Sequence, residues 1–167
     1  MRNRKFRAYD KIRDEMYYDN FVIYPKNWLC EFPEWGWDIK WETEDPKNFI
    51  LMDYTGWDDD NWKNIFEWDI LAEIKQDRNG KEYTSIIWIV IFWEYEWTPW
   101  YDITYWYGYF VLDKNEWESY LKNIEDRNNI SWSLIEVIND VRNNKNQLSV
   151  IGNIFENFEL IKKTDIY

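Results

Sequence analysis

Alternating apolar and polar positions run through the first two thirds of the chain and predict β-strands. Residues 6–9 alternate, residues 10–15 form a polar turn, and residues 16–24 are a second run rich in aromatic and β-branched side chains. Two such runs on either side of a short polar segment are typical of a β-hairpin. We therefore expect the chain to open with an antiparallel hairpin.

Residues 25–45 break this pattern. Prolines at positions 25, 33 and 46 punctuate the segment, and proline lacks the N–H group that the interior of a strand needs. Trp35, Trp37 and Trp41 alternate with other residues, so this stretch has room for one strand. Otherwise we expect it to be irregular.

The clearest turn lies in the middle of the chain. Asn79-Gly80 stands between two apolar runs, and this dipeptide readily adopts the positive φ that both central residues of a type I′ turn require. The pattern predicts a hairpin of residues 70–76 against residues 82–93. Further strands are expected at residues 49–54, 65–75 and 101–112.

The pattern changes in the last third and predicts a helical insertion. Over residues 115–124 the apolar side chains recur at helical spacing. A second helix is expected to begin near Ser133, because Glu136 three residues later completes a capping box. Trp132 and Val137 are placed to form a hydrophobic staple across this helix start.

The end of the chain is expected to return to β structure. A polar loop at residues 143–147 precedes a strand at Val150-Ile151, and residues 157–161 are expected to form a last helical turn. A length of 167 residues suits one domain, or one domain with an appendage. We predict a single mainly β domain, α+β overall, over residues 1–167: mostly β over 1–112, a helical insertion over 113–147, and a closing strand and turn over 148–167.

The acidic balance of the chain disfavours binding to nucleic acids. Asp and Glu number 32 and Lys and Arg number 20, which gives a formal net charge of −12. A chain of this charge is repelled by phosphate backbones. One local basic cluster is expected to be a solvated strand edge; it consists of Arg2, Arg4, Lys5 and Arg7.

The sequence shows no membrane-spanning or secretory pattern. Its longest apolar stretch, residues 86–93, falls short of the roughly 20 residues that cross a bilayer and predicts a buried strand. No apolar segment follows the basic N-terminus, so we expect no secretory signal. The single cysteine, Cys30, cannot form an internal disulfide, which agrees with a reducing cytoplasm.

Aromatic residues are the outlier in composition, with 14 Trp, 13 Tyr and 9 Phe. Aromatic rings stack on sugars and on bases, so they could form a binding face. They also have a high preference for strands, and we expect most of them to fill the sheets. A binding face would require the rings to be exposed and coplanar.

Three segments together resemble one protein family. They are residues 5–11, KFRAYDK; residues 51–71, with YTG, DNWK and EWDI; and residues 150–160, VIGNIFENFEL. They lie in the same order as the corresponding segments of the YopX family of phage and prophage proteins and bracket nearly the whole chain. The stretches 25–48 and 115–145 carry no part of this resemblance.

The resemblance implies a mostly β protein with an SH3-like β-barrel core, β-hairpins and a small C-terminal helical insertion. It also implies a phage or prophage gene expressed in the bacterial cytoplasm. It implies no catalytic, cofactor-binding or metal-binding residue, because the family offers none that could be carried over to this chain.

Several tryptophans stand where the resemblance implies glycine or a small residue. The family pattern has Asn-Gly at Asn61-Trp62, Glu-Gly-Asp around Trp68, and often a small residue at Trp88. A bulky residue forced into left-handed backbone costs roughly 1–2 kcal/mol. Two hypotheses stay open: some of these positions record UGA codons that the source organism reads as Gly, or the chain has diverged and its loops relax around the rings.

The residue types present argue against most catalytic chemistries. The chain has no histidine, which removes imidazole-based triads and zinc sites, and Cys30 has no CxxC partner. None of the five glycines has phosphate-loop spacing. Asp58-Asp59-Asp60-Asn61 could offer oxygens to Mg²⁺ or Ca²⁺, but it lacks the alternating spacing of a calcium loop, so we expect a solvated hairpin tip.

One carboxylate cluster merits inspection for glycoside cleavage, which needs two carboxyl groups about 5–9 Å apart. It consists of Glu94, Glu96 and Asp102, set among Trp93, Trp97, Trp100 and Tyr101. Acidic residues are frequent throughout the chain, so the cluster alone assigns no catalytic residue.

The sequence favours a non-enzymatic accessory protein that acts through protein–protein contact, either with an unidentified partner or with a second copy of itself. Aromatic side chains are enriched at such interfaces. One alternative is an acidic mimic of DNA that inhibits a host DNA-binding protein; it requires carboxylates spaced along one face like phosphates. The other is a carbohydrate-binding or carbohydrate-cleaving protein; it requires exposed stacked rings and convergent carboxylates.

Overall fold

The structure is a computed structural model of the chain, which describes residues 5–18, 22–24, 29–33, 41–44, 46–97, 104–113, 116–117 and 132–162. The protein is mainly β, as predicted. It forms two compact units, Met1–Tyr54 and Thr55–Tyr167. The assignment of the whole chain to one family domain stays a prediction.

The first unit contains the predicted opening hairpin. Strand β1 (Phe6–Asp10) pairs antiparallel with β2 (Glu15–Tyr17), and on its other side with the first half of β6 (Phe49–Asp58). In the turn, the Asp10 carboxylate accepts hydrogen bonds from the N–H groups of Ile12 and Arg13 at 2.7 and 3.1 Å. The hairpin prediction is therefore confirmed.

A second small sheet in this unit differs from the sequence expectation. Strands β3 (Val22–Tyr24), β4 (Leu29–Pro33) and β5 (Trp41–Glu44) form an antiparallel sheet in that order. The expectation of one strand over residues 16–24 was wrong, and so was that of irregular structure at 29–33. Strand β5 begins at Trp41, in the stretch where the sequence left room for a strand. Strands of three to five residues contain too few positions for alternation to be visible. Trp35 and Trp37 lie outside the described residues.

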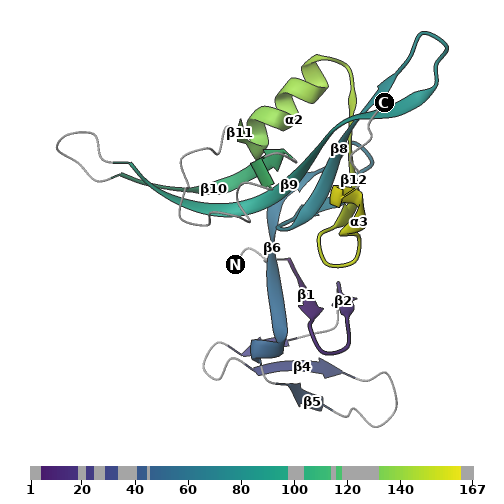
Figure 1. Cartoon of the computed structure of the whole chain (residues 1–167). Coiled ribbons are helices and arrows are strands. Elements are labelled where there is room, and N and C mark those ends of the chain that lie inside the picture. Colours follow the sequence, from purple (N-terminus) through teal and green to yellow (C-terminus); the bar gives the residue numbers. More distant parts are fainter. Residues whose placement is uncertain are drawn as a thin grey trace. The chain divides into compact units, whose positions relative to one another are not determined.

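The second unit is built on a five-stranded antiparallel sheet (Figure 1). In order across the sheet, its strands are β11 (Trp132–Ser133), β10 (Thr104–Asp113), β9 (Glu82–Trp97), β8 (Asp69–Gln76) and β12 (Gln147–Asn153). The predicted hairpin at Asn79-Gly80 is β8–β9, with Leu71 opposite Trp88. The antiparallel sheets confirm that the protein is mainly β. The SH3-like barrel stays a prediction.

The turn of this hairpin is not the predicted type I′. Gly80 has φ +78°, whereas Asn79 is not left-handed, and a type I′ turn needs both. The Gly80 N–H donates to the Asp77 carbonyl at 3.0 Å, and the Asp77 N–H donates to the Lys81 carbonyl at 2.9 Å. The loop therefore has three residues, with a tight turn followed by a left-handed glycine.

The expected strand over residues 65–75 is interrupted. Strand β7 (Asn64–Phe66) lies beside β6, while β8 begins only at Asp69 and belongs to the five-stranded sheet. A tight turn at Glu67-Trp68 separates the two strands, because Trp68 adopts φ +66°. Strand β6 itself continues past Gly56 to Asp58, four residues beyond the predicted end.

The predicted capping box is present at the start of helix α2 (Leu134–Asn143). The Ser133 N–H donates to the Glu136 carboxylate at 2.8 Å, and the Glu136 N–H donates back to the Ser133 hydroxyl at 3.4 Å. The Trp132 side chain, and with it the staple, lies outside the described part. Of the helix predicted over 115–124, only residues 116–117 are described, and they are helical.

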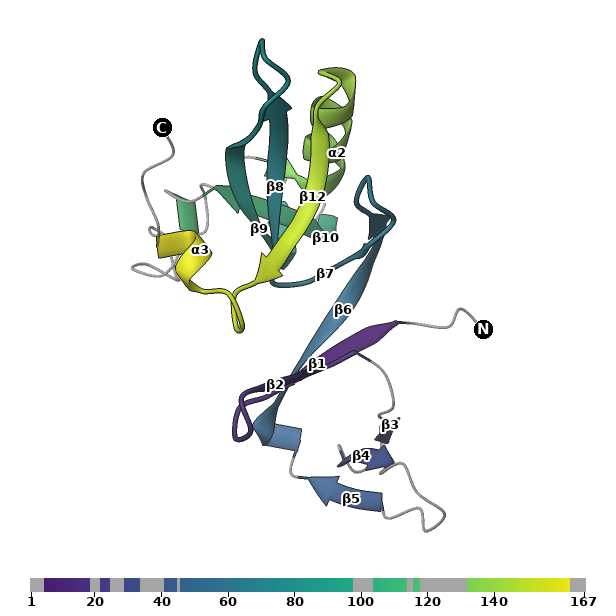
Figure 2. The ribbon, with the colours of Figure 1, turned by 90° about the vertical axis from the view of Figure 1, so that its right-hand side faces the viewer.

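Both faces of the five-stranded sheet are covered near its centre (Figures 1 and 2). On one face, Trp88 and Val90 of β9 pack with Val137 and Ile138 of α2. On the other, alternate β9 residues pack in a second cluster. That cluster contains Ile89 and Ile91 with Trp117 and Ile161, the last from helix α3 (Glu159–Lys162). Within the described residues, no helix is long and apolar enough to cross a membrane.

Candidate functional site: the acidic turn and the turn before strand β8

The acidic turn, residues 58–64, joins β6 to β7. Asp59 is buried at 3% exposure, and its carboxylate accepts three backbone hydrogen bonds. One oxygen accepts from the N–H groups of Asn61 and Lys63 at 2.8 and 2.9 Å. The other accepts from the N–H of Val150 on β12 at 2.9 Å. Asp59 thus fixes both the turn and its attachment to the sheet.

Asp60 makes a second set of attachments. Its carboxylate accepts from Arg142 Nε at 2.8 Å and from the Leu148 N–H at 2.7 Å, and its own N–H donates to the Leu148 carbonyl at 3.1 Å. The Arg142 guanidinium also donates to the Asp58 carbonyl at 3.3 Å. The acidic turn is therefore tied to α2 and to β12.

These contacts decide between the two interpretations of the acidic residues. The prediction of a solvated tip is wrong for Asp59, because it is buried and accepts a hydrogen bond from a backbone N–H 91 positions away. Its oxygens are occupied by N–H groups, which suits a structural carboxylate. Among the described residues, no group of three or more acidic or cysteine side chains could hold a metal ion.

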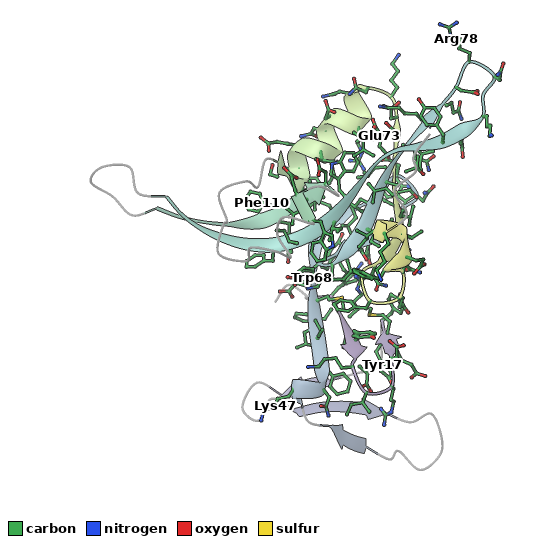
Figure 3. The ribbon with its side chains drawn as sticks, in the orientation of Figure 1. Tyr17, Lys47, Trp68, Glu73, Arg78 and Phe110 are labelled. Atoms are coloured by element: carbon green, nitrogen blue, oxygen red, sulfur yellow. The ribbon has the colours of Figure 1, made fainter. Side chains whose placement is uncertain are left out.

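The turn at Glu67-Trp68 is fixed in a similar way. Asp69 is fully buried, and its carboxylate accepts from the Phe66 N–H at 2.7 Å. The Trp68 N–H donates to the Val90 carbonyl at 2.8 Å, and the Trp68 carbonyl accepts from the Ile154 N–H at 3.1 Å. Figure 3 shows Trp68 at the base of the second unit's sheet. Strand β9 on one side and the turn after β12 on the other thus hold its backbone.

Residues 5–162 match the YopX protein family. The chain belongs to the YopX family. A crystal structure of protein EF1440 from Enterococcus faecalis resembles it with a TM-score of 0.48 and 19% sequence identity, over 95% of this chain and 97% of that one. None of the curated proteins compared with the chain matches it significantly.

Left-handed backbone is present at two of the three tryptophans that stand where the resemblance implies glycine or a small residue. Trp62 has φ +63° and Trp68 has φ +66°. Trp88 differs, since it lies in strand β9 and is buried at 8% exposure in the core. The Trp68 ring meets the Trp117 ring edge-on at 6.4 Å, whereas Trp62 is 85% exposed.

The remaining candidate residues from the sequence are placed as follows. Glu94 and Glu96 lie on β9 opposite Tyr107 and Tyr105, but their side chains and all of Asp102 lie outside the described part, so the carbohydrate alternative stays a prediction. Cys30 lies on β4, and its side chain is likewise outside that part.

The expectation that the basic cluster is a solvated strand edge is wrong for Arg7, whereas Lys5 is exposed. Arg7 lies on the central strand β1, between β2 and β6, and is buried at 2% exposure. Its Nε lies 3.0 Å from the Met52 sulfur. Lys5 places its ammonium 5.1 Å from the centre of the Tyr54 ring. The expectation failed for Arg7 because β1 is an interior strand of its sheet, which its sequence does not reveal.

Several carboxylates of this acidic YopX protein are buried. Besides Asp59 and Asp69, they include Asp10 and Glu73. Glu73 pairs with Lys75 Nζ at 3.0 Å and accepts from the Asn146 amide at 2.6 Å. Buried carboxylates cannot form part of a surface row that imitates phosphates, so these four residues do not support the DNA-mimic alternative.

Proposed function

We propose that this YopX-family protein acts by binding a protein partner in the cytoplasm of a bacterium that carries the phage or prophage, without catalysing a reaction. The observation that supports this proposal is the exposed end of the β8–β9 hairpin, residues 76–83. Figure 1 shows this hairpin extending past the neighbouring strands of its sheet.

One large exposed side chain, Tyr83, lies in this hairpin end, and another, Ile86, lies three residues further along β9. Tyr83 is 46% exposed and Ile86 is 40% exposed. The turn that presents them is ordered by the Asp77 carboxylate, which accepts from the N–H groups of Asn79 and Lys81 at 2.8 and 2.9 Å. Exposed aromatic side chains on a rigid support contribute strongly to protein interfaces because little conformational entropy is lost on binding.

Site-specific photocrosslinking tests this proposal. A photoreactive amino acid is placed at Tyr83 in one variant and, as a matched control, at the exposed α2 residue Asn139 in another. We expect a discrete crosslinked product in cells from position 83 and none from position 139. Mass spectrometry then distinguishes a second copy of the chain from a different protein.

A second substitution makes the result specific. Ile86→Asp in the chain that carries the crosslinker at position 83 is expected to abolish the product. Equal crosslinking at positions 83 and 139, or a product that survives Ile86→Asp, would contradict the proposal.

A further inference from the structure

Two turns of this chain share the sequence pattern Asp-x-Asn-x-Lys and one hydrogen-bonding pattern. Residues 59–63 read DDNWK and residues 77–81 read DRNGK. In each, the N–H of the first residue donates to the carbonyl of the last residue at 2.9 Å. In each, one carboxylate oxygen of the first residue accepts from the N–H groups of the third and fifth residues at 2.8 and 2.9 Å.

The two turns differ in the residue at the fourth position. Trp62 and Gly80 both donate their N–H to the carbonyl of the first aspartate, at 3.1 and 3.0 Å. Both are left-handed, with φ +63° and +78°. Glycine adopts this conformation freely, whereas in any other L-residue the Cβ atom crowds the following carbonyl oxygen. Trp62 is 85% exposed, so burial of its ring does not offset this crowding.

The turn does not relax around the indole of Trp62. Relaxation would require φ to become negative. That change would break hydrogen bonds to Asp59, which is itself held by Val150. The backbone of the acidic turn is therefore set by its flanking residues, and the residue at position 62 must conform to it.

Trp68 is constrained by different contacts to the same conformation. Its N–H is bound by Val90 and its carbonyl by Ile154, and its φ is +66°. Its ring is half-buried against Trp117. The backbone at Trp68 is nevertheless left-handed, as at Trp62, although the hydrogen bonds that hold the two turns are different.

Composition points in the same direction. The chain has 14 Trp but only 5 Gly, whereas average usage of about 7% would give about 12 Gly in a chain of this length. A low number of glycines together with a high number of tryptophans is expected if some glycine codons were translated as tryptophan when the sequence was derived from the gene.

We infer that positions 62 and 68 are glycine in the protein as its own cell makes it, encoded by UGA codons that this cell reads as glycine. The UGA codon is a stop in the standard code and tryptophan in some variant codes, so a gene read with such a code shows Trp at these positions. Trp88 is outside the inference, because its strand backbone suits any residue. The proposed partner surface at Tyr83 and Ile86 does not depend on it.

The gene and the native protein test this inference together. Codons 62 and 68 are expected to be UGA, while the codon of the buried Trp117 is UGG. Peptide mass spectrometry of the protein isolated from its source cells is expected to show glycine masses at positions 62 and 68 and a tryptophan mass at position 117.

UGG codons at positions 62 and 68 would overturn the inference, and so would peptides with tryptophan masses there. A result in which one position has glycine and the other has tryptophan would overturn it for the latter. Each outcome is independent of whether the hairpin end at Tyr83 binds a partner.

Discussion

Trp62 and Gly80 occupy the same position in two turns with one hydrogen-bonding pattern, each donating its N–H to the carbonyl of an aspartate three residues earlier. The conformation of each turn is determined by hydrogen bonds between its first residue, an aspartate, and the backbone of its third and fifth residues. The side chain of the left-handed fourth residue takes no part in these bonds. Asp59 and Asp77 thus act in folding, since each carboxylate accepts two backbone hydrogen bonds within its turn.

Asp59→Ala is expected to destabilise the second unit by about 3 kcal/mol, because it leaves three backbone N–H groups without their acceptor, one of them on buried Val150. Asp77→Ala is the matched control. It removes two similar bonds from an exposed turn, so we expect a loss of only about 1 kcal/mol. Urea unfolding followed by near-ultraviolet circular dichroism measures both; equal losses would contradict the structural role of Asp59.

Gly152→Ala is expected to destabilise the protein by about 1–3 kcal/mol through overpacking. A Cβ atom at position 152 would lie 2.9 Å from the Asn157 Cβ and closer still to its side-chain oxygen. Asn157 cannot move away freely, because it exchanges hydrogen bonds with Asn153 at 2.9 and 3.1 Å.

Gly108→Ala provides the control for this substitution, since a Cβ there meets only the Phe110 ring at 3.7 Å. We expect its midpoint in urea to change little. If the midpoint of Gly152→Ala is also unchanged, the close approach of Asn157 is not a constraint on the fold.

Local features of the fold were predictable from the sequence, and long-range ones were not. The hairpin at Asn79-Gly80 and the capping box of Ser133 and Glu136 are each determined by a few neighbouring residues. The burial of Asp59 depends on Val150, 91 positions away, and the Arg142–Asp60 pair spans 82 positions. No local pattern reports such contacts.

The type of the Asn79-Gly80 turn shows the same limit at smaller scale. Asn-Gly suits a two-residue type I′ turn, but it equally suits a three-residue loop in which only the glycine is left-handed. The hydrogen bond between Asp77 and Lys81 decides for the longer loop. The repeated aspartate and lysine of DDNWK and DRNGK were the sequence signal that could have revealed both the loop type and the backbone at position 62.

Ser133→Ala is expected to cost about 1 kcal/mol, the usual value for loss of an N-cap. The hydrogen bonds from the Ser133 hydroxyl and N–H lower the pKa of Glu136 below its ordinary value of 4.5. Because the pKa is lower in the folded state than in the unfolded state, the ionised carboxylate stabilises the fold at pH values above 4.5. This stabilisation is lost as the pH falls through the lowered pKa of the folded state.

Glu136→Gln tests the charged part of this capping box. We expect the variant to be less stable than the original chain near pH 7, and the difference to vanish as the pH falls below 4.5. A difference that stays constant down to acid pH would show that the carboxylate charge makes no contribution.

Lys145→Gly is expected to raise the free energy of unfolding by about 0.5–1 kcal/mol, since Lys145 ends helix α2 in left-handed backbone with φ +59°. The N–H groups of Lys145 and Asn146 donate to the carbonyls of Arg142 and Val141, both at 3.0 Å, which is a Schellman motif. Lys145→Ala keeps the Cβ atom and is expected to bring no gain; an equal gain from both variants would rule out backbone strain.

The free energy of unfolding of Trp62→Gly against Trp62→Ala tests the central claim most directly, because both variants remove the ring and only glycine removes the Cβ atom. Trp57, 42% exposed in strand β6, provides the same pair of substitutions without positive φ. We predict that Gly is more stable than Ala by about 1 kcal/mol at position 62 and less stable than Ala at position 57. Ala equal to or more stable than Gly at position 62 would contradict a backbone fixed in the left-handed conformation.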